Sequence, residues 1–240
     1  MICEDQDEIV GALILFQKTN SYGEYVFDWA WADAFHRYGY RYYPKLLTAI
    51  PFTPATGPRM LLKTGTDRKH IVKALVNKVL QIQSEKEILS WHLLFPDIET
   101  ERLISDDRFL ERHGVQYHWI NREFNDFGDH LSTFTSKRRK EAKRERKRVI
   151  EQGVHLELFE GSDLNEKHID ILFQCYQSTY AVRGQKGYLN REFFSLLSQR
   201  IPHAIALLIA FIKHQPVGMS FCLQNDEILY GRYWGALYNI

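Results

Sequence analysis

A short motif that occurs twice constrains the fold of this chain more than any other sequence feature. Val10-Gly11 is followed 12 positions later by Tyr22-Gly23-Glu24-Tyr25, and Val217-Gly218 is followed 13 positions later by Tyr230-Gly231-Arg232-Tyr233. Each Val-Gly pair lies in a strand-like run, and each Tyr-Gly segment follows a turn. Each copy therefore predicts a hairpin of two strands. Two copies of one hairpin predict two related halves.

The order of the predicted elements divides the chain into residues 1–121 and 122–240. The pattern of strands and helices begins again after Asn121, and 240 residues are enough for two domains. We expect an α/β fold with mixed α+β sheets, whose second half is truncated at its C-terminal end because few residues follow its hairpin. The predicted strands are Ile9–Lys18, Glu24–Asp28, Lys45–Pro51, Ile88–Phe95, Val115–Ile120, Val154–Phe159, Ala204–Ile212, Val217–Leu223 and Glu227–Trp234, and the predicted helices are residues 67–83, Asp106–His113, Thr135–Gln152, Leu164–Tyr180 and Asn190–Arg200.

Several classes of protein are excluded by composition. The longest unbroken apolar run, Ala204–Ile212, is too short to span a bilayer, and the acidic N-terminus does not resemble a signal peptide. Three widely spaced cysteines fit a reducing compartment, so we expect a cytoplasmic protein. No spacing of histidines and carboxylates matches a metal motif, so no metal is assigned.

A strongly basic segment interrupts an otherwise mildly acidic chain. Residues 137–148, KRRKEAKRERKR, hold nine basic and two acidic side chains, a net charge of +7, whereas the whole chain carries +1. The segment fits a solvated helix face, a surface that binds the phosphates of RNA or of an anionic headgroup, or a device that positions an anionic substrate. It holds no aromatic or amide side chains, which argues against base-specific recognition.

A second unusual segment is aromatic. Ten of the 22 residues from Tyr22 to Tyr43 are Phe, Trp or Tyr, and Asp28 and Asp33 lie among them. Such a segment fits a pocket in which a carboxylate holds or deprotonates an amine. It equally fits an aromatic core in which Asp33 caps a helix and pairs with Arg37.

The loop PFTPATGPR, which ends at Arg59, follows a predicted buried strand. Its two threonine hydroxyls, glycine amide and arginine could bind a phosphate or carboxylate group, or the loop could be a crossover stiffened by proline. The chain has neither a Walker A motif nor a G-x-G-x-x-G motif, which argues against nucleotide binding by those devices.

Six stretches in order resemble one protein family. They are YVFDWAWADAFHRYGYRYYPKLLTAIPFTPATGPR, SWHLLFPD, QYHWIN, SKRRKEAKRE, GYLNREFF and LYGRYWGA, and they cover the chain from about Val10 to Ala236. They are similar to the FemAB-like family of predicted N-acyltransferases, described as peptidoglycan biosynthesis/recognition proteins, within the GNAT-like superfamily. The resemblance implies tandem GNAT-like halves, which agrees with the repeated hairpin.

The resemblance also implies a reaction. An acyl or aminoacyl group would pass to an amine by direct attack in a ternary complex, with no tightly bound cofactor. The donor would be acyl-CoA or aminoacyl-tRNA, and the acceptor a small molecule or a cell-wall precursor. The usual acyl-CoA loop, Q/R-x-x-G-x-G/A, is missing: residues 215–220 and 232–237 each fail at its last position.

The matching stretches and their chemistry give a set of candidate site residues. Asp28 or Asp33 would be the base, and basic residues after Ser136 would attract an anionic donor or acceptor. The alternatives are a non-catalytic module that binds RNA or a cell-wall precursor, and an inactive truncated remnant. The candidate substrate-binding residues are Tyr25, Trp29, Trp31, Arg59, His92, Trp119, Lys137, Arg138, Arg139, Arg232 and Tyr233.

Overall fold

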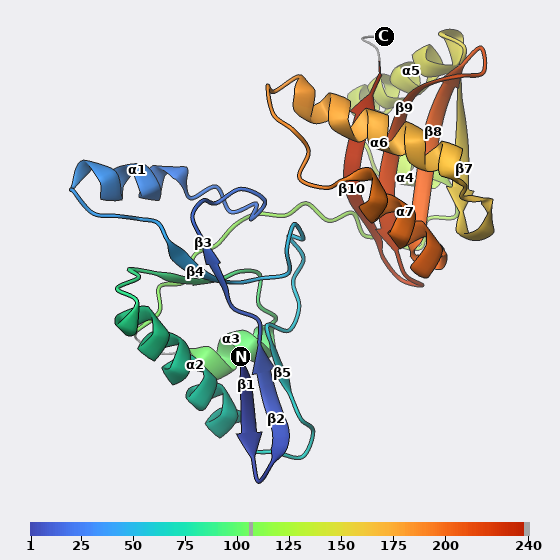
Figure 1. Ribbon diagram of the computed structural model, residues 1–240. Coiled ribbons are helices and arrows are strands. Elements are labelled where there is room, and N and C mark those ends of the chain that lie inside the picture. The colour runs from blue at the N-terminus through green and yellow to red at the C-terminus, as the bar shows by residue number, and fades with distance from the viewer. Residues whose placement is uncertain (106–107, 238–240) are drawn as a thin grey trace. The chain divides into compact units, whose positions relative to one another are not determined.

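The chain forms two compact units, each with its own core. The computed structural model describes residues 1–105 and 108–237, and the units comprise residues 1–118 and 119–240 (Figure 1). The predicted boundary after Asn121 lies close to this division. Within the described residues, no helix is both long and apolar enough to cross a bilayer.

Unit 1 combines two small sheets with one long helix. One sheet has the strand order β1-β2-β5 and is antiparallel. The other has the order β3-β4-β6, in which β3 and β4 are antiparallel and β4 and β6 are parallel. Its elements are β1 (Ile2–Asp5), β2 (Glu8–Leu13), β3 (Phe16–Lys18), α1 (Trp29–Arg37), β4 (Lys45–Thr48), β5 (Met60–Leu62), α2 (Arg68–Glu85), β6 (Trp91–Leu93) and α3 (Ile98–Ile104).

The helix α2 supplies five of the ten buried residues in the main apolar cluster of unit 1. Asp67 caps it by accepting a hydrogen bond from the backbone N–H of His70, as expected for an aspartate at this position. Ile71, Leu75 and Val79 recur at intervals of four residues and are buried against residues of β2, β4 and β5. The predicted helix over residues 67–83 is therefore confirmed.

Two predicted strands of unit 1 are wrong. Residues 24–28 form a loop in which Tyr25 and Phe27 have positive φ angles. The loop conformation turns the acids of this segment inward to a buried lysine, which a strand could not do. Val115–Ile120 is exposed, extended chain with no strand partner. The predicted helix Asp106–His113 is not seen at residues 108–113, and Asp106 and Asp107 lie outside the described residues.

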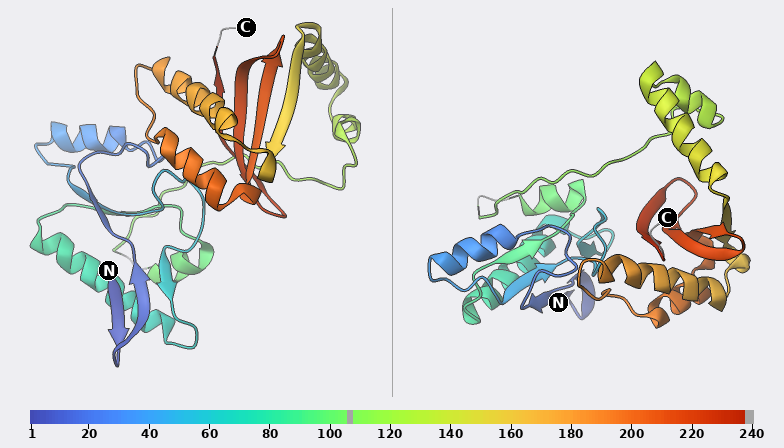
Figure 2. Two further views of the ribbon diagram at one scale, coloured as in Figure 1. Left: turned by 45° about the vertical axis from the view of Figure 1, so that its right-hand side comes forward. Right: turned by 90° about the horizontal axis from the view of Figure 1, so that it is seen from above.

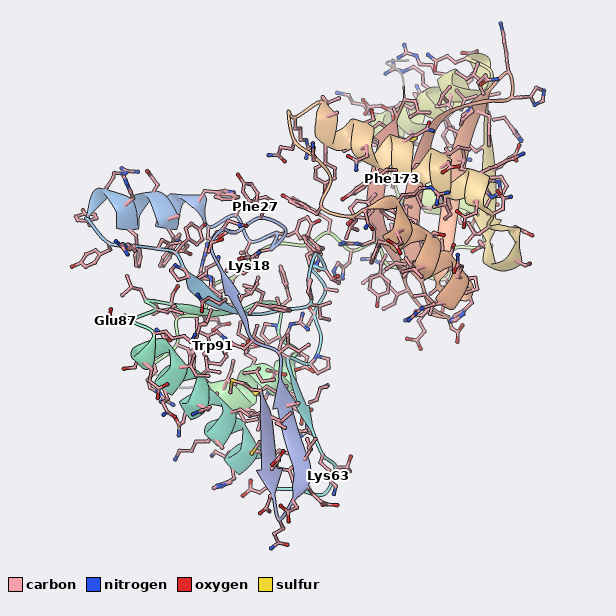
Figure 3. All side chains as sticks on the ribbon, in the orientation of Figure 1. Lys18, Phe27, Lys63, Glu87, Trp91 and Phe173 are labelled. Atoms are coloured by element: carbon pink, nitrogen blue, oxygen red, sulfur yellow. The ribbon has the colours of Figure 1, made fainter. Side chains whose placement is uncertain are left out.

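Unit 2 is one antiparallel sheet covered by helices. The strand order is β10-β9-β8-β7, and α6 and α7 lie across one face, with α4 and α5 on the opposite side (Figure 2). The buried core joins residues of α6 and α7 to β8 and β9, and Phe173 on α6 packs beside it (Figure 3). The elements are α4 (Phe127–Ser132), α5 (Ser136–Glu151), β7 (Val154–Glu160), α6 (Glu166–Ala181), α7 (Arg191–Arg200), β8 (Ile205–Ile212), β9 (Gln215–Gln224) and β10 (Leu229–Ala236), with 3₁₀ turns at Gly161–Asp163 and Pro202–Ala204.

The repeated motif has different structures in the two units. Both Val-Gly pairs lie on the second strand of an antiparallel hairpin, β1-β2 in unit 1 and β8-β9 in unit 2. The segment Tyr230–Tyr233 lies on β10 beside β9, as predicted. Tyr22–Tyr25 instead lies in a loop, and β2 pairs with β5. The second predicted hairpin is therefore confirmed, and the first is wrong.

Gly235 is the position where we expect unit 2 to be most sensitive to a single methyl group. A Cβ at this residue would overlap the backbone carbonyl of Cys175 on α6, which cannot move without displacing the helix. We expect Gly235→Ala to lower the free energy of unfolding of unit 2 by about 1–3 kcal/mol. Urea denaturation followed by fluorescence measures the change.

Gly231→Ala is the matched control on the same strand, because nothing lies within 4 Å of a Cβ added there. It should unfold close to the wild-type urea concentration. Equal stability of the two variants would show that α6 does not approach β10 as closely as described.

Candidate functional site

A buried lysine organises the polar part of unit 1. Lys45, the first residue of β4, has an exposed fraction of 0%. Its Nζ donates to Ser21 Oγ at 2.6 Å, to Glu24 Oε2 at 2.7 Å and to Asp28 Oδ2 at 2.6 Å. All three acceptors come from residues 21–28, so this group, the Lys45 cluster, fixes that loop to the sheet.

Asp28 is held as a carboxylate by its neighbours. Burial by itself would raise its pKa, but hydrogen bonds from Lys45, Tyr42 and Ser21 outweigh this effect and lower the pKa to about 2. Tyr42 Oη donates to Asp28 Oδ2 at 2.6 Å. Burial and the adjacent Asp28 carboxylate raise the pKa of Tyr42. The tyrosine therefore stays protonated and serves as a donor.

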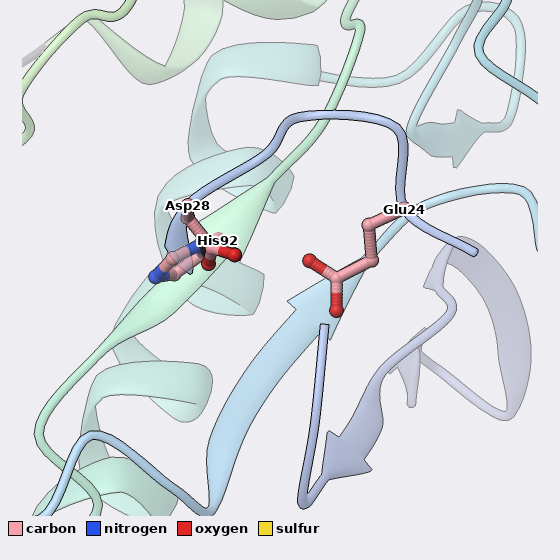
Figure 4. A group of neighbouring side chains, drawn as sticks. All are labelled: Glu24, Asp28 and His92. Carbon is pink, nitrogen blue, oxygen red and sulfur yellow. Dashed lines mark ion pairs between the residues drawn. The ribbon is translucent and has the colours of Figure 1, made fainter. Parts of the chain in front are cut away.

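His92, on β6, lies beside the Lys45 cluster. Its Nδ1 is 3.8 Å from Asp28 Oδ2 (Figure 4). Its Nε2 is 3.5 Å from the hydroxyl of Tyr42. Burial, followed by the positive charge of Lys45, lowers the pKa of His92 to about 4. The imidazole is therefore neutral near pH 7.

The same residues raise the question of a metal ion. Glu24, Asp28 and His92 offer ligand atoms within 4.8 Å of one another, a grouping that their sequence spacing did not indicate. Lys45 Nζ, however, lies 2.6–2.7 Å from an oxygen of each carboxylate. An ammonium in that position supplies the counter-charge that a cation would supply, so the donor set does not fit a metal ion.

An apolar pocket of about 230 Å³ adjoins the Lys45 cluster. Among the residues that the structure describes, two charged residues line it: Lys18, at the end of β3 (Figure 3), and Glu24, which also belongs to the cluster. Lys18 Nζ is 3.2 Å from Glu24 Oε1. The remaining lining residues are Phe16, Gln17, Tyr22, Gly23, Leu47, Ala49, Ile50, Pro51, Phe52, Thr53 and Phe95.

The position of the pocket and its backbone both favour a binding role. Leu47 and Ala49 lie at the carboxyl end of β4, and Phe95 lies just beyond the parallel strand β6, which is where ligands bind in open α/β sheets. Phe52 and Phe95 have φ angles of 54° and 51°, which bulky residues rarely adopt. Such strain gathers at functional sites. We therefore take this pocket as the candidate site.

Neither of the two predicted bases, Asp28 and Asp33, lines the pocket. Asp28 is inaccessible and ion-paired, and its pKa of about 2 makes it a weak base. Asp33 is 58% exposed on α1, is paired with Arg37 and does not line the pocket. The sequence missed Glu24, the acid that does line it.

The predicted residues Tyr25, Trp29 and Trp31 do not line the pocket. Trp29 packs against the ring of Tyr22, which lines the pocket. Trp31 lies under the guanidinium of Arg112. Tyr25 sits in the strained loop between Glu24 and Asp28.

Arg59 has a structural role. Its guanidinium donates to the carbonyl oxygens of Leu94, Ala55 and Gly57, at 2.6, 2.5 and 3.0 Å. The side chain is buried. These bonds shape the loop of residues 55–58, and they direct the guanidinium into the protein.

The predicted residues of unit 2 are divided among three places. Trp119 packs on His130 near α4. Arg232 stacks on Tyr233, which packs against the core residue Tyr176. On α5, Arg139 donates to three carbonyl oxygens at the end of α4, Arg138 pairs with Glu141, and Lys137 is exposed.

The strongest missed signal was a lysine at the start of an apolar strand. Lys45 begins KLLTAI, which was predicted to be buried. A buried ammonium requires carboxylate partners, and Glu24 and Asp28 are two of the three acids in the aromatic segment that precedes Lys45. Ser21, Tyr42 and Lys18 carry no comparable signal.

The match to a known protein family extends over the whole chain. Residues 1–240 match the family described as peptidoglycan biosynthesis/recognition. No curated protein matches the chain.

Replacing Lys45 should show how strongly the buried carboxylates of Glu24 and Asp28 destabilise the protein when their counter-charge is missing. We expect Lys45→Met to lower the free energy of unfolding by about 3–5 kcal/mol near pH 7, because both carboxylates lose their counter-charge. In the wild type, Asp28 contributes to the free energy of unfolding at pH values above its unfolded pKa. This contribution is lost only as the pH falls toward 2. In the variant, Asp28 should protonate at higher pH, so the deficit should shrink on acidification. Urea denaturation across this pH range measures it.

Lys63→Met is the matched control, because its pair with Glu8 is exposed. It should cost less than about 1 kcal/mol. If Lys45→Met also lowered the free energy of unfolding by less than about 1 kcal/mol, this result would contradict the buried cluster.

His92 should give the protein a pH-dependent stability. Its folded pKa of about 4 lies below the unfolded value of 6.5. The unfolded chain therefore binds the extra proton first, and stability falls as the pH drops from 6.5 toward 4. We expect His92→Gln to remove about 1–2 kcal/mol of the stability change between about pH 7 and about pH 5. His113→Gln, at an exposed position, should leave that change intact.

Proposed function

This chain belongs to the FemAB-like family of peptidoglycan biosynthesis and recognition, and we propose that it is an N-acyltransferase. The family's members are transferases in peptidoglycan synthesis. The reaction we propose moves an acyl or aminoacyl group from acyl-CoA or aminoacyl-tRNA to an amine. The acceptor is a small molecule or a cell-wall precursor.

The observation that carries this proposal is the pairing of an apolar pocket with one carboxylate, Glu24, in its wall. A pocket of about 230 Å³ walled by Phe16, Leu47 and Phe52 suits the substituent of an acyl group, because apolar surface is favourably buried there. Glu24 and Lys18 then lie at the polar side of that group. An amine and a carbonyl brought to this side would each meet an opposite charge.

In the proposed reaction, the amine nitrogen attacks the carbonyl carbon and forms the new C–N bond. Glu24 takes the proton that the nitrogen loses, and Lys18 stabilises the negative charge on the carbonyl oxygen. The C–O or C–S bond to the donor then breaks, and the leaving group receives the proton. Lys45 acts as a positioning residue because it holds the other oxygen of Glu24.

The tandem GNAT-like architecture is part of the same proposal. It is supported by the Val-Gly strand, which is the second strand of a hairpin in both units. We further propose that Lys137 and its basic neighbours on α5 attract the anionic donor or acceptor by long-range charge.

Two variants separate chemistry from binding. Glu24→Gln keeps the shape of the side chain, so it should retain the rise in melting temperature caused by millimolar acyl-CoA or by aminoacyl-tRNA, whichever binds. Its kcat should fall about 10²- to 10⁴-fold. Ile50→Trp should fill the pocket and lose both the thermal shift and turnover.

Ile228→Trp is the matched control, because Ile50 and Ile228 are 46% and 47% exposed and only Ile50 lines the pocket. Ile228→Trp should keep both the thermal shift and the turnover. Wild-type turnover by Ile50→Trp, measured with a soluble peptidoglycan precursor as acceptor, would place the reaction outside this pocket.

A further inference from the structure

The outer face of α5 carries a row of cations without partners. Lys137, Lys140, Arg144 and Arg148 recur at intervals of three or four residues and so share one side of the helix. All four are exposed. Within the described residues, none of them forms an ion pair or a side-chain hydrogen bond. The row extends for about 16 Å at the rise of an α-helix.

The inner face of α5 is fixed to α4. Arg139 donates to the carbonyl oxygens of Leu131, Ser132 and Phe134, which satisfies the C-terminal end of α4. The guanidinium of Arg146 lies 4.1 Å from the centre of the Phe127 ring. The two helices are therefore held as one rigid hairpin, and the outer row of cations does not contribute to holding them.

A shallow apolar groove runs between the two helices. Its apolar residues are Phe127, Leu131 and Ile150, and its volume is about 480 Å³. Lys143, Arg146 and Lys147 lie along its edge, together with Glu151, which pairs with Lys147. Ile150 is 73% exposed. A surface that places aliphatic carbon beside many cations has the chemistry of an interface for anionic amphiphiles.

We propose that the α4–α5 surface docks on an anionic phospholipid bilayer. The row of cations would meet the headgroup phosphates, and the groove with Ile150 would take the upper part of an acyl chain. RNA fits less well: it offers no aliphatic group for the groove, and the one aromatic ring there, Phe127, is covered by Arg146. The inference goes beyond the proposed transfer reaction, because it concerns where unit 2 binds.

Sedimentation with lipid vesicles tests this proposal. The wild-type chain should bind vesicles made of phosphatidylglycerol and phosphatidylcholine in equal parts, and should not bind pure phosphatidylcholine. Replacement of Lys137, Lys140, Arg144 and Arg148 by Gln should weaken binding about fivefold per cation, and on the order of a hundredfold or more together. Higher salt should weaken wild-type binding in the same direction.

The matched control removes four exposed lysines of unit 1, on α2 and at its end, and so changes the net charge equally. Its vesicle binding should stay within about threefold of wild type, because these lysines lie outside the α4–α5 surface and exposed charges act only over about a Debye length. The four positions are Lys69, Lys73, Lys78 and Lys86, each changed to Gln.

Ile150 tests the contribution of the groove separately. Ile150→Asn should weaken vesicle binding about 3- to 10-fold through loss of buried apolar surface. Val182→Asn, at an exposed position in unit 2, should not change it. Binding to polyuridylate but not to anionic vesicles would overturn the proposal in favour of RNA. Equal binding by the α5 and α2 variants would overturn it as well. Neither result depends on whether Glu24 transfers an acyl group.

Discussion

The ammonium group of Lys45 is the interaction on which the site of unit 1 depends. A buried charge is strongly unfavourable unless partners surround it. Here three partners come from one short loop, Ser21, Glu24 and Asp28. Satisfying the lysine therefore determines the path of residues 21–28, and that path places Glu24 and Tyr22 in the wall of the pocket.

The resulting site divides sharply into a charged side and an apolar side. Asp28 lies deep in the cluster, where its low pKa and full burial suit a structural anion. Glu24 shares Lys45 with it but also reaches the pocket and Lys18. In a low-dielectric setting such interactions are strong. Both acids thus hold Lys45, and Glu24 is the one that also lines the pocket.

Unit 2 presents a chemical surface that differs from that of unit 1. Its sheet packs against α6 and α7 through an aromatic core that includes Tyr176, Phe194 and Phe221. The basic helix α5 contributes no buried residue. Among the cations of its described residues, Arg139 and Arg146 are the ones that hold it against α4. The remaining charge is left facing outward, where it acts on partners rather than on stability.

The sequence by itself determined the elements with clear periodicity or caps. These include α2 with its Asp67 cap, α5 between Thr135 and Gly153, and the β8–β10 meander. It also indicated the family and the aromatic segment that forms part of the site. It could not determine which acids meet Lys45, because Glu24 and Asp28 lie 21 and 17 residues away and local spacing carries no information on that contact. Local patterns predicted a strand at residues 24–28, but the need to neutralise a buried ammonium favoured a loop. Only the tertiary structure decided that Asp28 is buried and that Glu24 faces the pocket, because burial and charge pairing depend on segments that are distant in sequence.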